Sequence, residues 1–273
     1  MFRRSTHISF VLSAIGFVFI ASQAIAQLPF TVTGVDGGGY VKARATCTGT
    51  PQVRKAAHSM NPTYNLNVDV SCNNVGVPGS ASGGAQSISK STAIGGTEVQ
   101  LSTNYNTKAT AFEAYGEGNF KLEGESDSYW EVQNTSNNTI TIAFKWSVTE
   151  ITNGSNPGGF AEADASIEIT DEVGNPLKGL GQPGSGTLLV CVPPGFKFFI
   201  TLYAYSKSKA TSVNPTAGAN ANANASAIVN LSVSNQIIGG CDSVVVEDPP
   251  PPPPPCGAPG LKGSREAGCA GAS

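Results

Sequence analysis

Alternation of apolar and polar residues along the chain predicts a protein built from β-strands. The clearest segment is 139–148, TITIAFKWSV, in which every second residue from Ile140 to Val148 is apolar. Side chains in a strand point alternately to the two faces of a sheet, so one face is packed and the other is hydrated. Segments 64–72 and 219–233 repeat this pattern, and the inward positions of 219–233 are largely alanine. Such small inward side chains predict a place where two sheets approach closely.

Turn-forming residues separate the alternating segments and indicate many short strands. Glycine, asparagine and proline recur between them, and no segment has the period of an amphipathic helix. Further strands are expected at 30–35, 40–47, 98–103, 107–117, 119–123, 128–134, 163–170, 186–192 and 196–206. The sequence therefore predicts an all-β fold, an antiparallel β-sandwich, of which the jelly roll is one form.

Three segments differ in composition from the expected strands. Residues 75–96 are rich in glycine, serine and alanine and are expected to form a long flexible loop, and Gly37-Gly38-Gly39 is expected to form a turn. Seven prolines at 249–255 favour a polyproline II rod, and small polar residues follow it. We therefore expect a β-sandwich domain over 27–246 and a disordered proline-rich tail over 247–273.

The N-terminus has the features of a secretory signal peptide. Arg3 and Arg4 precede the apolar run 8–21, and Ala24-Ile25-Ala26 fits the pattern that signal peptidase cleaves. The apolar run is shorter than the ~20 residues that span a bilayer. We expect cleavage of residues 1–26 near Ala26, no transmembrane anchor in the mature chain, and a secreted, extracellular or periplasmic protein.

Charge and cysteine content narrow the class of protein further. The formal net charge is −3 and no strong basic cluster is present, so the protein is expected not to bind nucleic acid. Six cysteines in an exported chain favour disulfides over zinc, because the close Cys spacing of zinc sites is missing. Sequence alone leaves many pairings open. Pairing between neighbours would join Cys47 to Cys72, Cys191 to Cys241, and Cys256 to Cys269.

The residues needed for common hydrolytic chemistry are scarce. Without the signal peptide, His58 is the only histidine, and it is expected in a polar loop. Glu113 and Glu117 would lie ~13 Å apart along a strand, too far for glycoside hydrolysis. Glu123 and Glu125 have a suitable spacing but are expected in an exposed turn, where burial would not raise the pKa of an acid. We therefore expect that the protein is not an enzyme.

Two segments are candidate binding sites. Asp171, Glu172 and Asn175 offer oxygen ligands in a hairpin turn and could bind calcium as a cofactor; the alternative is an ordinary turn with solvated acids. If Phe198 and its alternate neighbours face the core, the other face of that strand carries three aromatic side chains, Phe199, Tyr203 and Tyr205. These rings could form a platform for sugars, or they could be covered and belong to a core.

Part of the chain resembles a known kind of exported protein. The residues concerned are Trp130-Glu131-Val132-Gln133-Asn134, 140–148, 161–169, Val192-Pro193-Pro194-Gly195 and the alternating run 219–233. In texture they resemble the β-sandwich ectodomains of exported Gram-negative bacterial proteins of the PEP-CTERM-associated kind. The Val-Pro-Glu-Pro sorting signal of that family is missing here. The resemblance implies an association with surface or matrix material and implies no site residues.

These observations together predict a secreted or cell-surface, non-enzymatic β-sandwich with a structural, adhesive or matrix role. Its expected partner is an extracellular polysaccharide or another cell-surface component. Two alternatives remain open at this point: a carbohydrate-binding module assisted by calcium, and an enzyme that acts on polysaccharide through carboxylates.

Overall fold

A computed structural model describes residues 28–76, 79–113, 118–155, 158–212, 218–236 and 241–248. The predicted signal peptide, the proline run at 249–255, Cys256 and Cys269 lie outside these described residues. All regular elements within them are strands, which confirms the all-β prediction. The strands are β1 (Phe30–Thr46), β2 (Val53–Ser59), β3 (Tyr64–Asn73), β4 (Gly79–Ile94), β5 (Glu98–Glu113), β6 (Gly118–Asn134), β7 (Ile140–Gly154), β8 (Gly159–Asp171), β9 (Pro176–Leu180), β10 (Gly184–Val192), β11 (Lys197–Ser212), β12 (Ala219–Val233) and β13 (Val245–Glu247).

The strands form two antiparallel sheets that pack face to face. Sheet A has the order β2-β1-β6-β11-β8-β9, and sheet B has the order β13-β10-β7-β12-β5-β4-β3. The central strand β11 of sheet A packs against β5 and β12 of sheet B. This arrangement confirms the predicted antiparallel sandwich. The last strand ends at Glu247, one residue beyond the domain end predicted from composition.

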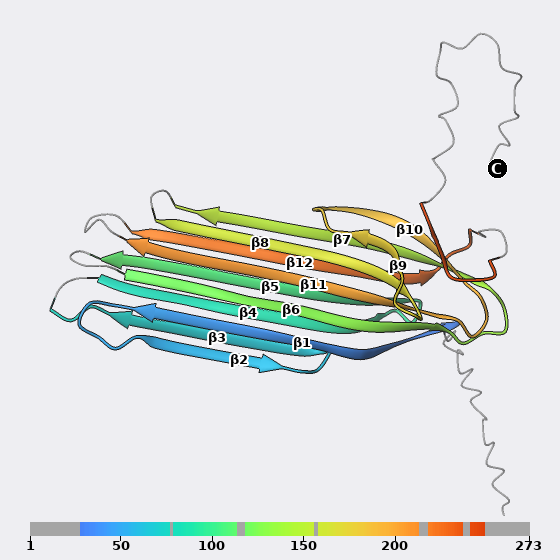
Figure 1. The fold of residues 1–273 in the computed structure, drawn as a ribbon, viewed down its shortest axis with the longest axis horizontal. Helices are drawn as coiled ribbons and strands as arrows, with labels where there is room; N and C mark the ends of the chain where they lie inside the picture. The colour runs from blue at the N-terminus through green and yellow to red at the C-terminus, as the bar shows by residue number, and fades with distance from the viewer. Residues whose placement is uncertain are drawn as a thin grey trace, which may run out of the picture.

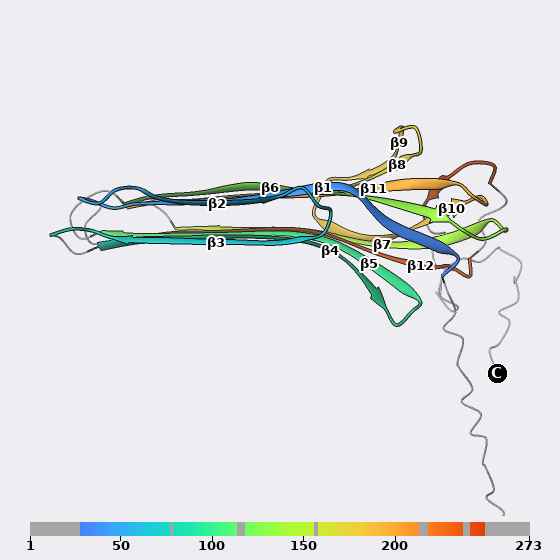
Figure 2. The ribbon, with the colours of Figure 1, turned by 90° about the horizontal axis from the view of Figure 1, so that it is seen from below.

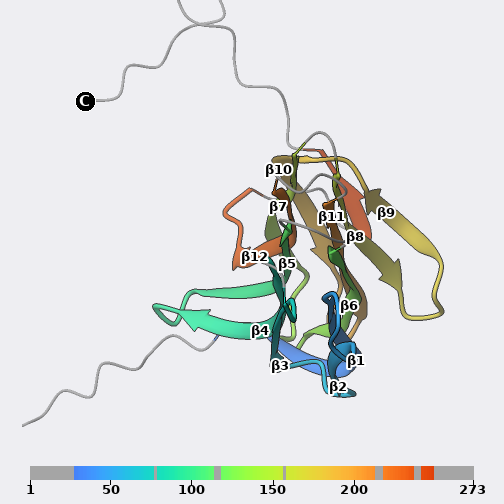
Figure 3. The same cartoon turned by 90° about the vertical axis from the view of Figure 1, so that its left-hand side faces the viewer.

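The molecule is a long, flat blade. Its strands run along the longest axis (Figure 1), and a view from the edge shows the two sheets as separate layers (Figure 2). Seen from one end, the β4–β5 hairpin and the β8–β9 hairpin project from the body in different directions (Figure 3). The layers lie closer together at the end where β1 ends and β12 begins than at the opposite end (Figure 2).

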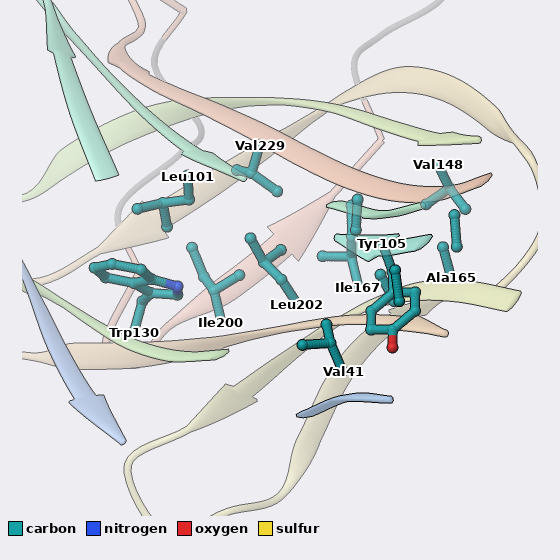
Figure 4. Packing of buried hydrophobic residues seen from close by; sticks show 14 of the residues in the cluster. Val41, Leu101, Tyr105, Trp130, Val148, Ala165, Ile167, Ile200, Leu202 and Val229 are labelled. Carbon is teal, nitrogen blue, oxygen red and sulfur yellow. The ribbon is translucent and has the colours of Figure 1, made fainter. Parts of the chain in front are cut away.

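The size of the buried side chains explains this taper. In the wide half, Trp130, Ile200 and Leu202 of sheet A pack towards Leu101 and Val229 of sheet B (Figure 4). In the narrow half the buried side chains of β12 are alanines, as far as Ala227, and the facing strands also contribute alanine or serine. The buried alanine face of β12 agrees with the prediction that two sheets approach closely along it.

Polar side chains bridge the two sheets inside the narrow half. The hydroxyl oxygens of Thr107 on β5 and Ser208 on β11 lie 2.8 Å apart, and Ser206 donates a hydrogen bond of 3.2 Å to Thr107. The phenol of Tyr105 crosses the interior and donates to the backbone oxygen of Tyr40 on β1 (2.9 Å). All four hydrogen-bonding side chains are buried. Such fully paired groups can be accommodated in an interior where an unpaired hydroxyl would be costly.

Three local predictions are wrong. Residues 75–96 do not form a flexible loop, because 79–94 is the strand β4, paired with β5 along its whole length and with β3 over 80–89. Gly37-Gly38-Gly39 is not a turn, because these glycines continue β1 through a bulge between Gly34 and Asp36. His58 lies in the edge strand β2 and not in a loop. In each case pairing with neighbouring strands outweighs the weak strand preference of the local sequence.

Two of the predicted disulfides are confirmed. Cys47 is bonded to Cys72, and Cys191 is bonded to Cys241. The first joins the end of β1 to β3 and so links the two sheets at the narrow end, whereas the second joins β10 to the segment before β13 at the wide end. Within the part of the chain that the structure describes, no helix is long and apolar enough to cross a membrane.

Candidate binding face on sheet A

The alternation of β11 divides its aromatic and aliphatic side chains between two environments. Phe198, Ile200 and Leu202 point into the core and are fully buried. The intervening side chains, among them Phe199 and Tyr203, therefore stand on the outer face of sheet A. This confirms the orientation expected from the sequence for the strand.

For Phe199 the structure favours the second of the two alternatives, a covered ring. The ring of Tyr129, on the neighbouring strand β6, stacks on Phe199 with ring centroids 4.8 Å apart and planes 7° from parallel. The ammonium group of Lys197 lies 5.6 Å from the centroid of the same ring and is paired with Glu131 at 3.0 Å. These neighbours leave only 9% of Phe199 exposed. Phe199 thus acts as a support for Tyr129, which is itself half-buried.

A hollow of about 290 Å³ lies beside Tyr129. It is lined by Asp36 and Gly37 of β1, by Asp127, Ser128 and Tyr129 of β6, and by Thr201 of β11. The strand register explains this grouping, because Asp36 is paired with Tyr129, and Tyr129 with Thr201. Both aspartates are exposed, so their carboxylates face solvent at the hollow.

The outer face continues along β11 with Tyr203 and Tyr205. Tyr203 is paired across the strands with Asp127 and Ser166, and Tyr205 is paired with Asp164. Both tyrosines are half-buried. Aromatic rings therefore follow β11 away from the hollow with carboxylates on the neighbouring strands. Of the three predicted platform residues, two have the partial exposure that a contact surface needs.

This arrangement suits a ligand rich in hydroxyl groups. A fixed aromatic ring offers a flat apolar surface to the C–H face of a sugar. Carboxylate oxygens accept strong hydrogen bonds from hydroxyl groups and disfavour an anionic ligand through repulsion. Asp36 and Asp127 supply these acceptors beside Tyr129. The site therefore combines the apolar wall and the polar acceptors that a neutral sugar unit requires.

The predicted calcium ligands lie in the turn between β8 and β9. One carboxylate oxygen of Asp171 accepts hydrogen bonds from the backbone N–H groups of Val173 (3.0 Å) and Asn175 (2.8 Å). The other accepts a bond of 2.8 Å from the side-chain amide of Asn175. The hydrogen bond from that amide is the main cause that lowers the pKa of Asp171 below its ordinary value of 3.8; desolvation opposes it, and the backbone N–H groups of the turn lower the pKa further. These contacts are those of a closed turn, while Glu172 is exposed beside it.

The remaining candidates are metal-binding groups and pairs of carboxylates. Among the described residues, no group of three or more His, Cys, Asp or Glu side chains could hold a metal ion. Glu117 lies outside the described residues, as do the side chains of Glu113, Glu123 and Glu125, which formed the candidate carboxylate pairs for hydrolysis. Calcium binding at Asp171, Glu172 and Asn175 stays a prediction.

Sequence reasoning missed the residues that build the hollow. Asp36, Asp127, Tyr129 and Thr201 come from three strands, and their proximity depends on the register between strands that are distant in sequence. The one available signal was the alternation at 128–134, which places Tyr129 on the face opposite to Trp130.

In comparisons with known proteins, no family model, no curated protein and no solved structure matches the chain. The resemblance to PEP-CTERM-associated proteins therefore remains a prediction from texture.

Proposed function

We propose that this protein is a secreted or cell-surface, non-enzymatic β-sandwich with an adhesive or matrix role, and that the outer face of sheet A binds a neutral polysaccharide. The observation that carries the proposal is the hollow in which Tyr129, supported by Phe199, stands beside Asp36 and Asp127. The two disulfides support it as well, since they indicate an oxidising compartment outside the cytoplasm.

The geometry favours binding over catalysis for this hollow. Asp36 and Asp127 are both exposed, and an exposed carboxylate keeps the solvation that suits an acceptor of sugar hydroxyl bonds. Thr201 on the floor is small and half-buried, so the hollow is open enough for a chain to lie across the sheet. An aromatic ring already held by stacking, as Tyr129 is on Phe199, loses little conformational entropy on binding.

The test is a site-resolved titration by NMR. Cellohexaose serves as the neutral probe, with an alginate oligomer as the anionic probe and a chitosan oligomer as the cationic one. We expect cellohexaose to shift the backbone amide signals of Asp127, Tyr129 and Thr201. The variants Tyr129→Ala and Asp127→Asn should each raise the Kd reported by these amides at least tenfold, because each removes one of the contact types described above.

Glu168→Gln is the matched control. Glu168 is exposed on β8 and paired with Thr201, but it does not line the hollow, so this variant should bind like the wild type. The proposal fails if none of the three probes shifts the amides around the hollow. Release of new reducing ends, lost in Asp36→Asn and Asp127→Asn, would instead identify a polysaccharide-acting enzyme.

A further inference from the structure

The outer face of sheet B carries a row of amide side chains that crosses four neighbouring strands. Asn67 of β3 is paired with Gln86 of β4, Gln86 with Asn106 of β5, and Asn106 with Asn224 of β12. Asn67 and Asn106 are exposed and Gln86 and Asn224 are half-buried, and each alternates with inward-facing positions of its strand, so all four share the outer face. Since adjacent strands lie ~4.8 Å apart, the row extends for ~14 Å across the sheet.

A glycine opens a groove beside this row. In the adjacent row, Asp69 of β3, Gly84 of β4 and Lys108 of β5 are paired across the strands. A Cβ atom on Gly84 would collide with the carboxylate of Asp69 and would lie 3.2 Å from Cε of Lys108. Those two side chains therefore lean over the glycine. The resulting hollow of about 250 Å³ is lined by Asn67, Asp69, Gly84, Ala85, Gln86, Asn106 and Lys108.

The lining has the composition expected for a neutral, hydroxyl-rich ligand. Each amide offers both donors and an acceptor, so neighbouring amides can bond the paired hydroxyl groups of a sugar ring. The single negative charge of Asp69 is balanced by the single positive charge of Lys108, so the groove has no net preference for an ion. The amide row runs across several strands and so presents repeated contacts to an extended chain.

We propose that this groove binds a second segment of neutral polysaccharide, and that the protein thereby joins two polysaccharide chains. The inference rests on the proposed function, because the first chain is held at the hollow on sheet A. The two sites lie on the outer faces of different sheets, which form the opposite sides of the blade (Figure 2). Neither bound chain would therefore occupy the position of the other, and one molecule can cross-link them.

Matrix proteins with one sugar-binding face and those with two act differently on polysaccharide. A blade with one sugar-binding face coats a polysaccharide, whereas a blade with two faces connects chains into a network. The second behaviour gains from multivalency, because a chain held at one site raises the effective concentration at a neighbouring molecule's sites. Cross-linking can be measured without knowing the natural polysaccharide.

The experiment measures whether the protein, once bound to one polysaccharide, retains a second one. Insoluble cellulose is incubated with the full mature protein, washed, and then exposed to fluorescent hydroxyethyl cellulose. We expect the wild type to retain the soluble polymer on the solid. The double variant Gln86→Ala, Asn106→Ala should still bind the solid through sheet A but retain at least tenfold less fluorescent polymer. In the NMR titration, cellohexaose should also shift the amides of Gln86 and Asn106, and these shifts should survive in Tyr129→Ala.

Two further variants test whether the groove itself retains the soluble polymer. Gly84→Ala introduces a small side chain that a strand accommodates, and its Cβ displaces the flexible end of Asp69. This variant should therefore lower the retention of soluble polymer without unfolding the sheet. Asn104→Ala is the matched control, because it removes an asparagine side chain from the strand and outer face that carry Asn106, one row outside the groove. This variant should retain polymer like the wild type.

The outcomes distinguish this inference from the one on which it rests. Shifts confined to sheet A, with binding to cellulose but no retained polymer, overturn the second site and leave the first. No shift on either face overturns both. Equal retention of alginate or chitosan overturns the neutral ligand class.

Discussion

At the scale of single residues, Asn134 shows how one polar side chain holds several chain segments together. It is 1% exposed at the end of β6. Its amide nitrogen donates hydrogen bonds of 2.8 Å to the backbone oxygens of Asn138 and Val192. Its amide oxygen accepts bonds from the backbone and the hydroxyl of Ser136 (2.9 and 2.8 Å). One side chain thus closes the turn between β6 and β7 and attaches it to the end of β10.

This geometry predicts a large effect from a nearly isosteric change. Asn134→Asp replaces the donating nitrogen by an oxygen, so the two backbone carbonyl groups lose their donor and face a buried carboxylate. We expect the free energy of unfolding, measured by urea denaturation, to fall by about 2–4 kcal/mol. Asn137→Asp, in the same turn at an exposed position, should change it by no more than about 0.5 kcal/mol. Equal effects of the two changes would contradict the assigned hydrogen bonds.

At the scale of elements, β12 shows how the choice of small side chains sets the distance between the sheets. Its inner face is alanine from Ala219 to Ala227 and changes to valine and leucine towards its end. Alanine is a weak strand former, and β12 is held by pairing with β5 over 219–232 and with β7 over 221–233. The sheets can approach in the narrow half because the buried side chains there, apart from Tyr105, are mostly alanine, serine and threonine.

Enlarging one of these alanines should therefore force the sheets apart. Ala223 is 1% exposed and is paired with Thr107, whose hydroxyl is in the bridging cluster. Ala223→Leu should lower the free energy of unfolding by about 1–3 kcal/mol or more through overpacking. Asn222→Leu, on the exposed face of the same strand, should change it by only about 0.5 kcal/mol. A tolerated leucine at 223 would mean that the interior of the narrow half is less tightly filled than described.

The same elements show how far the sequence can predict the fold. Alternation predicted β3, β7, β11 and β12 well, because each has one buried and one hydrated face. Alternation did not predict β4, because the glycine and serine residues of this strand show no apolar period. Pairing with β3 and β5 on its two sides holds β4 in the sheet. The binding hollow was unpredictable for a related reason: Asp36, Tyr129 and Thr201 meet only through inter-strand register, which the sequence does not specify over such distances.

At the scale of the whole molecule, the two ends of the blade are held together in different ways. The wide end has a core of large apolar side chains, including Trp130 and Phe144, which hold the sheets together through buried area. The narrow end has alanine and paired hydroxyl groups, which contribute less buried apolar surface. The disulfide between Cys47 and Cys72 links the two sheets at this narrow end.

We therefore expect the Cys47–Cys72 disulfide to stabilise the narrow end locally, in addition to its contribution to the free energy of unfolding of the whole domain. Its sequence separation is 25 residues, for which loop entropy gives a stabilisation of about 3–4 kcal/mol. In the variant Cys47→Ala, Cys72→Ala, hydrogen exchange should accelerate at least tenfold in β3 and in the end of β1, and much less in β7, where large buried side chains keep the sheets packed. The variant Cys191→Ala, Cys241→Ala should instead release β13, which has only three paired residues, and leave β3 protected. Faster exchange spread evenly over both ends in the first variant would show that the blade unfolds as one unit, and that its narrow end does not depend on the disulfide for local stability.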